Sequence, residues 1–246
     1  MQLDKFRLVG TADDEREAFG RLVQDIDYVP GAILYSEMLF MKAGMSQFEP
    51  LRVIEAGRGA GVSTEILARC FPDMPIISVE RDAKAPGAEA AKARLGTYTD
   101  VDCRFGDPSE VLLEIAKPGD IALIGDPGGF AGLKLMLKLL ATRKFDLAFL
   151  HGIRPDTPER AFLNKHLPET CFSDDPDFAE VVHELDAKAK SSLPADSQYE
   201  STRGKFGYGL SLACLPYDAR LNYNSLARKA GTQALKKGIG RLFGGK

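Results

Sequence analysis

The sequence predicts an α/β fold with a doubly wound, mainly parallel sheet that is covered by helices on both faces. Two observations lead to this prediction: apolar runs alternate with helix-like segments five times, and the runs are continuously apolar. Strands that are buried on both faces have this pattern, because the helices of the strand–helix crossovers cover the sheet. A chain of 246 residues is long enough to bury the core of one such domain.

Each element is predicted from its own pattern of apolar residues. The strands are expected at residues 51–56, 75–80, 101–107, 120–126, 145–152 and 208–216. Helices are expected at residues 63–71, 87–96, 108–117, 130–143, 157–167 and 177–193. Two more helices are expected before the first strand, at residues 12–26 and 31–45. The first of these has apolar residues at helical spacing after an acidic first turn, which suits a helix N-terminus.

Composition and charge narrow the class of protein. Hydrophobic residues make up 44% and charged residues 27%, which is typical of a globular protein, and the net charge of −3 gives no basic field for nucleic acid. The cysteines are far apart and form no CxxC pair: Cys70, Cys103, Cys171 and Cys214. They indicate reduced thiols rather than disulfides or a zinc site. With no signal peptide and no long apolar run, a cytoplasmic location is expected.

Three segments are expected along the chain: an N-terminal helical segment (1–50), the α/β domain (51–217) and a basic C-terminal tail (218–246). After Asp218 the tail has no acidic residue but seven lysines and arginines, which are mixed with apolar residues. As a helix it would be amphipathic and basic, which is typical of contact with a membrane surface or a partner. The alternative is a solvated terminal helix that frays, which the glycines from Gly238 onward favour.

The stretch VIEAGRGAGVSTEILARC, residues 53–70, carries the first functional signal. A strand that ends in Gly57, Gly59 and Gly61 and leads into a helix lets backbone approach a ligand closely, and a side chain at Gly57 or Gly59 would block that approach. The following helix offers free N–H groups and a positive dipole end. Dinucleotide binders have G-x-G-x-x-G, but Val62 occupies the place of the third glycine, which disfavours an NAD-dependent oxidoreductase.

The G-x-G-x-G spacing, with Glu55 two residues before the first glycine, resembles the first motif of class I S-adenosylmethionine-dependent methyltransferases. The resemblance implies a Rossmann-like sheet and S-adenosylmethionine as cofactor. It also implies that the loop of Gly57, Gly59 and Gly61 wraps the methionine part of the cofactor. Glu55 would contact the amino end of the cofactor through water or backbone.

Two further acids are candidates for binding the cofactor. Glu80 ends the second strand, 19 residues after Gly61, where an acid can accept hydrogen bonds from both ribose hydroxyls. Its alternative role is that of a solvated acid in a loop. Asp107 follows the third strand in FGDP, and the resemblance implies that it accepts from the adenine amino group. Asp107 is also a good cap for a helix that begins at Pro108.

The ends of the fourth and fifth strands are expected to face the methyl acceptor. Asp126, in IGDPGGF, is the acid best placed for catalysis, with a turn-forming role as the alternative. The region after the fifth strand looks similar to small-molecule O-methyltransferases of the sugar and antibiotic-tailoring kind. Those enzymes often hold a divalent metal through acids at these two strand ends, which would make Asp126 a magnesium ligand. The fifth strand ends in His151 instead of an acid, so His151 is a candidate general base or ligand.

The sequence therefore predicts a methyltransferase that acts on an oxygen of a small molecule or glycan. Tyr35 and Glu37, which precede the first strand, are candidates to close over the cofactor, and Arg58 is a candidate to meet a carboxylate. The alternative is a non-catalytic protein that keeps the fold and acts as a scaffold or partner subunit. The acceptor and the oligomeric state have no signature in the sequence.

Overall fold

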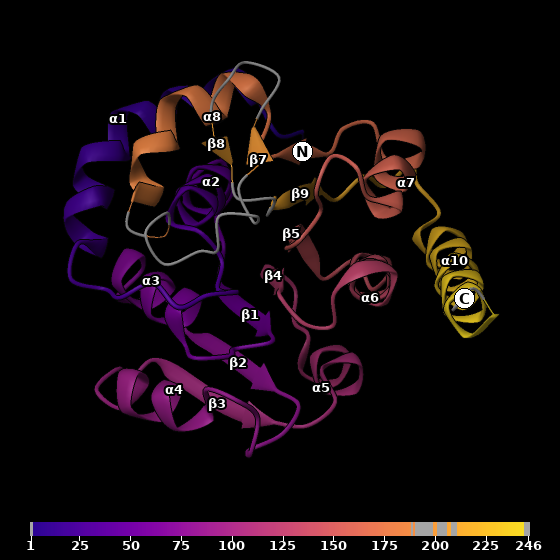
Figure 1. Ribbon diagram of the computed structural model, residues 1–246, viewed down its shortest axis with the longest axis horizontal. Helices are drawn as coiled ribbons and strands as arrows, with labels where there is room; N and C mark the ends of the chain where they lie inside the picture. Colours follow the sequence, from indigo (N-terminus) through magenta and orange to yellow (C-terminus); the bar gives the residue numbers. More distant parts are fainter. Residues whose placement is uncertain (1, 188, 190–198, 201–205, 208–210, 244–246) are drawn as a thin grey trace.

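The computed structural model describes residues 2–187, 189, 199–200, 206–207 and 211–243. Its centre is a seven-stranded sheet of order β3-β2-β1-β4-β5-β9-β6 (Figure 1). The strands are β1 (Arg52–Ala56), β2 (Ile76–Glu80), β3 (Val101–Phe105), β4 (Asp120–Ile124), β5 (Phe145–Leu150), β6 (Cys171–Phe172) and β9 (Ala213–Pro216). β1 to β5 run parallel, β9 runs antiparallel to β5, and β6 runs antiparallel to β9. The predicted mainly parallel sheet is confirmed.

The sheet is apolar on both faces because alternate residues of its central strands belong to two separate cores. Val53 packs in one hydrophobic cluster, while its neighbours Ile54 and Ala56 pack in the other. β4 divides in the same way, with Ile121 in the first cluster and Ala122 in the second. A pleated strand points successive side chains to opposite faces, so continuous apolar runs are what two covered faces require.

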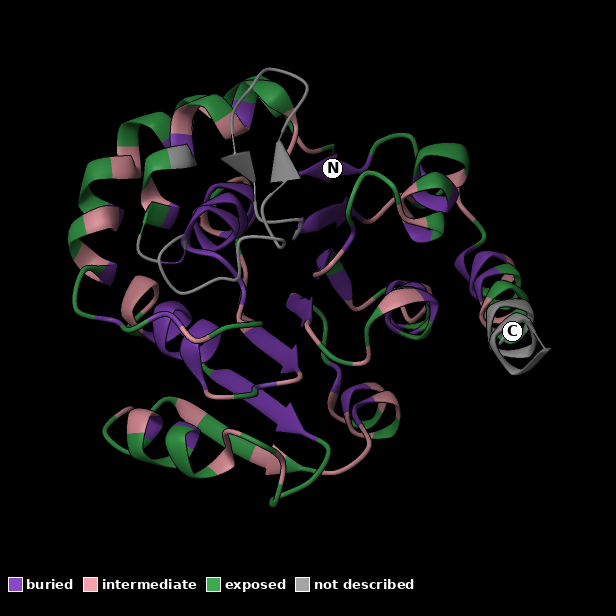
Figure 2. Cartoon of the chain, in the orientation of Figure 1, coloured by how far each residue is buried: buried purple, intermediate pink, exposed green. Residues whose placement is uncertain are grey.

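The helices form a layer on each face of the sheet. On one face lie α1 (Lys5–Val23), α2 (Tyr35–Met45), α3 (Val62–Cys70) and α8 (Pro176–Val182). On the other face lie α5 (Pro108–Ile115), α6 (Gly129–Ala141), α7 (Pro158–His166) and α10 (Tyr223–Phe243). The helix α4 (Ala88–Leu95) contacts α3. Buried residues fill β1, β2, β4 and β5 and most of α2 and α3, while β3 at the edge of the sheet and the outer faces of α1 and α4 are exposed or half-buried (Figure 2).

Several predicted boundaries are wrong for local reasons. The first helix begins at Lys5 rather than residue 12, because the Asp4 side chain accepts hydrogen bonds from the Phe6 and Arg7 backbone N–H groups and caps it there. The second helix begins at Tyr35 rather than residue 31, and the last strand begins at Ala213 rather than residue 208.

Other differences concern short elements. The segment predicted as one helix at 177–193 is α8 followed by a 3₁₀ turn, η1 (His183–Asp186), and residues 190–193 lie outside the described residues. The two-residue strand β6 and the small sheet of β7 (Tyr199–Glu200) with β8 (Phe206–Gly207) were not predicted. Strands of two residues are too short to show any periodicity in a sequence.

The basic C-terminal segment forms α10, which lies beside α6 (Figure 1). Tyr223, Leu226, Ala227 and Ala230 of this helix are buried in the second core. The first half of the tail is therefore part of the layer that covers the sheet. The expected division into three segments stays a prediction. Among the helices that the structure describes, none has both the length and the apolar character needed to cross a membrane.

Candidate functional site

The candidate site lies at the carboxyl edge of the sheet, between β1 and β4. The strand order reverses direction there, and ligands of open α/β sheets bind in the crevice beyond such a switch point. The backbone N–H groups of Gly57, Asp126 and His151 donate to carbonyls at the ends of β2, β1 and β4, at 2.9, 3.0 and 2.9 Å. These bonds bring the predicted residues that follow β1, β4 and β5 together along one edge.

The three glycines of the loop after β1 have three different surroundings. A Cβ atom added at Gly57, which has a φ of 86°, would lie 2.4 Å from the Asp126 backbone nitrogen. At Gly61 the added atom would lie 3.3 Å from Ala91 of α4. At Gly59 it would have no atom within 4 Å. Packing against Asp126 is therefore a reason of its own for Gly57, and the space beside Gly59 is open. That both glycines make room for a ligand stays a prediction.

Glu55 is part of a closed hydrogen-bond network beneath the loop. Its carboxylate is 1% exposed and accepts hydrogen bonds from the hydroxyls of Ser63, Thr64 and Ser78, each at 2.5 Å. The network joins β1 to α3 and β2, and it satisfies a charge that would otherwise be costly to bury. Glu55 thus fixes the shape of the loop. Its predicted contact with a cofactor stays a prediction.

Glu80 holds the tip of the same loop against the end of β2. Its Oε2 accepts a hydrogen bond from the Gly59 N–H at 2.9 Å, and its Oε1 accepts from the Arg81 N–H at 2.8 Å. Glu80, the residue predicted to bind the ribose, therefore lies directly beside the open space at Gly59. Arg58 points away from that space, because it donates to the Ser78 carbonyl at 2.7 Å and lies over the Phe105 ring.

Asp107 performs the helix-capping role that was its alternative. Its Oδ1 accepts hydrogen bonds from the backbone N–H and the hydroxyl of Ser109 at 2.8 Å, and its Oδ2 pairs with Arg81 at 3.1 Å. The bonds from Ser109 and the charge of Arg81 hold the pKa of this carboxyl below its usual range. The predicted contact with adenine is untested.

Asp126 lies at the end of β4, directly over Gly57, and is exposed. Its carboxylate has no hydrogen-bond partner among the described residues. Within that same part of the chain, no cluster of three or more His, Cys, Asp or Glu side chains is arranged to hold a metal ion. Whether Asp126 acts in catalysis or as a metal ligand is untested by the structure.

His151 lies next to Glu37, which the sequence analysis assigned to the cofactor rather than to the acceptor. Its Nε2 lies 3.4 Å from Oε2 of Glu37, whose side chain is 1% exposed. Glu37 Oε2 also accepts the Leu34 N–H at 2.8 Å, and so caps the start of α2. Glu37 Oε1 and His151 Nε2 are both buried without a hydrogen-bond partner among the described residues. The sequence named Glu37 as a residue over the cofactor but gave no sign of its contact with His151.

A second buried acid, Asp186 of η1, lies at the same end of α2. Its Oδ1 accepts the Ser36 N–H at 3.0 Å. Burial, together with the nearby charge of Glu37, raises the pKa of Asp186 to about 7. No sequence signal indicated this residue, because its position depends on how η1 packs against α2.

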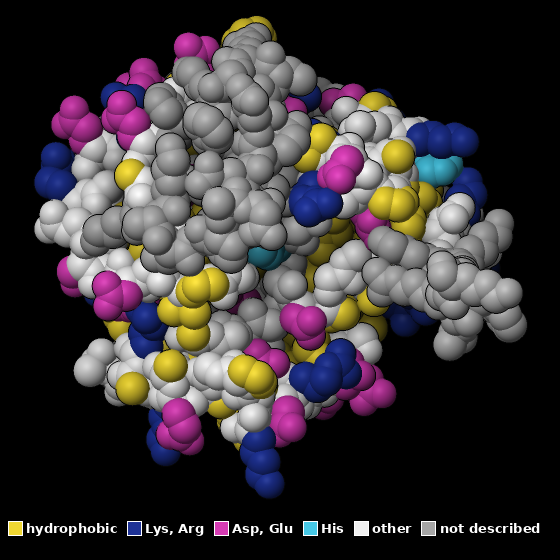
Figure 3. All heavy atoms as spheres, viewed as in Figure 1, with side chains coloured by type: hydrophobic (Ala, Val, Ile, Leu, Met, Phe, Trp, Pro, Cys, Tyr) yellow, Lys and Arg dark blue, Asp and Glu magenta, His cyan; other side chains and the backbone are white. Residues whose placement is uncertain are grey.

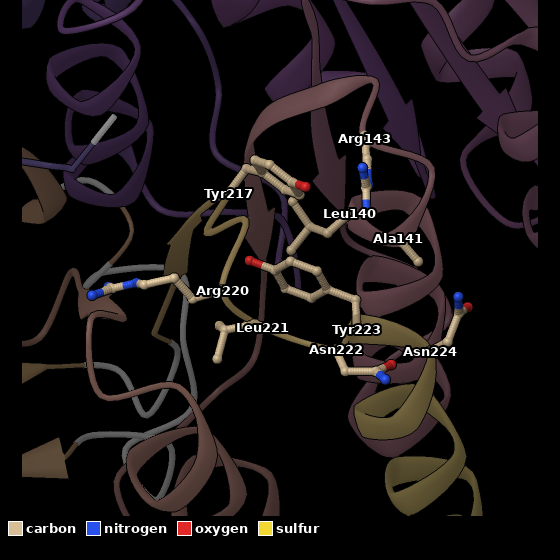
Figure 4. A pocket seen from close by; sticks show the side chains of 9 residues that line it. All are labelled: Leu140, Ala141, Arg143, Tyr217, Arg220, Leu221, Asn222, Tyr223 and Asn224. Carbon is tan, nitrogen blue, oxygen red and sulfur yellow. The ribbon is translucent and has the colours of Figure 1, made fainter.

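A separate pocket of about 310 Å³ lies at the opposite edge of the sheet. It is lined by Tyr217, which follows the strand residue Pro216 that pairs with Leu147 near the start of β5. The rings of Tyr217 and Tyr223 stack with centroids 5.6 Å apart, and Arg143 and Arg220 lie on either side of them (Figure 4). None of the predicted site residues lines this pocket.

Charged side chains are mixed on the molecular surface. Acidic and basic side chains are interspersed over the described part of the face in Figure 3. The chain has nearly equal numbers of basic and acidic residues and a net charge of −3, so no single sign of charge dominates this face.

No protein-family model and no curated protein sequence matches the chain. Similar solved structures include precorrin-6y C5,15-methyltransferase from Geobacter metallireducens, with a TM-score of 0.50 and 12% identity over 86% of this chain and 98% of that one. An O-methyltransferase from Bacillus cereus in complex with S-adenosylhomocysteine has a TM-score of 0.47 and 14% identity over 83% and 90%. The O-methyltransferase TomG from Streptomyces achromogenes has a TM-score of 0.45 and 14% identity over 87% and 97%.

The likeness to the Geobacter enzyme spans most of both chains. Together with the strand order, in which one antiparallel strand is inserted next to β5, it shows that the chain has the Rossmann-like fold of class I methyltransferases. At this level of identity the likeness concerns the fold, so the activity has to be argued from the site.

Proposed function

We propose that this protein is an S-adenosylmethionine-dependent methyltransferase that acts on an oxygen of a small molecule or glycan. The observation that carries the proposal is the open space at Gly59, which the Glu80 carboxylate borders at the switch point of the sheet. A nucleoside fits such a place, because bare backbone admits it closely and a carboxylate accepts from both ribose hydroxyls. Similar solved structures include complexes with S-adenosylmethionine and S-adenosylhomocysteine, which supports this choice of ligand.

S-adenosylmethionine, when bound, supplies a methyl group activated by its sulfonium. The chain would hold the nucleoside with Glu80 and the backbone at Gly59, and Asp107 would lie beside the base. Asp126 and His151 follow neighbouring strands on the acceptor side, where His151 would take the proton of the acceptor hydroxyl. The remaining task of the site is to align acceptor and methyl group and to exclude water.

The alternative is a non-catalytic protein of the same fold that serves as a scaffold or partner subunit. The observation that favours it is that both Glu80 oxygens and the Gly59 N–H already bond within the chain. A cofactor would have to compete with these bonds or share them.

Calorimetric titration with S-adenosylhomocysteine, with NAD as the control, tests the proposal. We expect micromolar binding of the former and none of the latter. Gly59→Val should raise the dissociation constant of S-adenosylhomocysteine at least tenfold while the protein remains folded, because its branched side chain would occupy the open space. If the wild type binds neither ligand, or the Gly59→Val variant binds normally, the glycine loop does not form the cofactor site.

The acceptor and the location of the protein are part of the proposal. Similar solved structures include an O-methyltransferase involved in tomaymycin synthesis, which supports methyl transfer to an oxygen. A cytoplasmic location, peripheral membrane contact through the end of α10 and the use of magnesium stay predictions.

A further inference from the structure

The carboxylate of Glu37 and the imidazole of His151 form a buried pair at the acceptor end of the site. Glu37 is 1% exposed and the His151 side chain 10% exposed, and Nε2 and Oε2 are 3.4 Å apart. Each residue also has one buried polar atom without a partner among the described residues, Oε1 of Glu37 and Nε2 of His151. Such atoms are rare in folded proteins and destabilise them, so they point to chemistry rather than to packing.

We infer that Glu37 is the positioning residue of His151, an inference that rests on the proposed methyl transfer to oxygen. The carboxylate fixes the ring with its proton on Nε2 and leaves the lone pair on Nδ1. In a neutral imidazole one nitrogen donates and the other accepts, and the partner of one nitrogen decides which state is present. A carboxylate accepts hydrogen bonds only, so the nitrogen that faces Glu37 is the one that carries the proton.

The two nitrogens then have different tasks in the reaction. The acceptor hydroxyl gives its proton to Nδ1 of His151, while an oxygen lone pair forms the new bond to the methyl carbon. The electrons of the carbon–sulfur bond remain on sulfur, which leaves as the neutral thioether. Many enzymes orient a general base with a third group in this way. A distance of 3.4 Å is long for a hydrogen bond, but such contacts commonly tighten only when substrate is bound.

The charged groups that surround the pair in the described part of the chain are carboxylates. Asp186 of η1 lies close enough to feel the charge of Glu37, and the neutral hydroxyl of Tyr28 feels both acids. Asp126 follows the next strand. In the described part of the chain, no lysine or arginine forms an ion pair with Glu37 or Asp186. His151 therefore receives the proton of the acceptor beside carboxylates, which attract positive charge.

Helix capping explains the position of Glu37 Oε2 but not the buried, unpartnered Oε1 or the approach of the carboxylate to His151. Oε2 already caps α2 by accepting the Leu34 N–H, and Asp186 accepts the Ser36 N–H at the same helix end. Asp186 is thus a matched control, since it is a buried carboxylate that caps the same helix but does not face Nε2.

Nitrogen-15 NMR of the histidine rings tests the inference without cofactor or acceptor. The chain has three histidines, so His151→Gln identifies the signals of His151. In the neutral ring of the wild type we expect the proton on Nε2 and slow exchange of that proton with water. Glu37→Leu should speed this exchange at least tenfold, whereas Asp186→Asn should change it less than twofold.

Two results would overturn the inference: a wild-type ring with its proton on Nδ1, or equal exchange rates in Glu37→Leu and Asp186→Asn. If Glu37→Leu does not fold, Glu37→Gln keeps an oxygen for the Leu34 cap and should still speed exchange at least threefold; an unchanged rate would count against the inference. S-adenosylhomocysteine binding, measured on the same samples, reports separately on the proposed function. If the wild type does not bind S-adenosylhomocysteine, the proposed methyltransferase function is rejected, whatever the NMR shows.

Discussion

Two equally buried glutamates at one edge of the sheet differ in how their charges are satisfied. Glu55 accepts three hydroxyl hydrogen bonds, whereas Glu37 accepts one backbone hydrogen bond and leaves Oε1 without a partner among the described residues. Both side chains are 1% exposed. The region around Glu55 is therefore built for stability, and the region around Glu37 keeps polar atoms available. The comparison teaches that burial alone does not tell a structural carboxylate from a functional one.

The largest effect is expected from Gly57→Ala, which breaks the stable region. A non-glycine residue at a φ of 86° costs about 1–2 kcal/mol. The overlap of its Cβ with the Asp126 backbone adds about 1–3 kcal/mol. We expect the free energy of unfolding in urea to fall by roughly 2–5 kcal/mol.

Gly59→Ala is the matched control for that change. Its φ of 52° also lies in the left-handed region, but its Cβ would meet no atom within 4 Å. Only the backbone cost of about 1–2 kcal/mol should remain. Equal losses of stability in the two alanine variants would show that the contact of Gly57 with Asp126 is unimportant.

Replacing each glutamate by glutamine sharpens the comparison. In Glu55→Gln the remaining oxygen can keep the hydrogen bonds of Thr64 and Ser78, so one hydroxyl loses its acceptor. A hydrogen bond to a charged group contributes about 1.5–3 kcal/mol, so we expect a loss of roughly 2–3 kcal/mol. Glu37→Gln keeps an oxygen for the Leu34 N–H and replaces Oε1, which has no hydrogen-bond partner among the described residues, so stability should change by less than about 1 kcal/mol. Urea unfolding of both variants measures the difference. A greater loss in Glu37→Gln than in Glu55→Gln would reverse the assignment of the two regions.

The sequence predicted the parts of the fold that depend on local patterns. The continuous apolar runs of β1 and β4 identify strands covered on both faces, and the acid and glycines from Glu55 to Gly61 identify the loop at the switch point. The extension of the first helix to Lys5 was missed because one capping residue, Asp4, decides it.

Contacts between distant segments were beyond the reach of the sequence. Glu37 was named for the cofactor and His151 for the acceptor, but they are 114 positions apart, and only the packing of α2 over the end of β5 brings them together. The packing reason for Gly57 was missed in the same way, because its neighbour Asp126 belongs to a different strand end. Local patterns locate a site, whereas tertiary packing decides what each of its residues does.

The last effect builds up gradually with pH and concerns Asp186, the buried acid near Glu37. Its folded pKa of about 7 lies above the usual value of about 4, so the folded protein keeps a proton that the unfolded chain releases. This stabilisation is complete below about pH 4 and is lost as the pH rises through about 7, with a slope of at most about 1.4 kcal/mol per unit. Asparagine resembles the protonated acid, so Asp186→Asn should gain stability relative to the wild type as the pH rises from about 4 to 7.

Asp107→Asn is the control of opposite sign for this series. Because the pKa of Asp107 is held below its usual range, its stabilisation is present above the unfolded pKa of about 4 and is lost only as the pH falls through the lower folded value. Thermal unfolding of both variants and the wild type between pH 3 and 8 measures the two trends. A constant difference between Asp186→Asn and the wild type over this range would mean that Asp186 is ionised throughout.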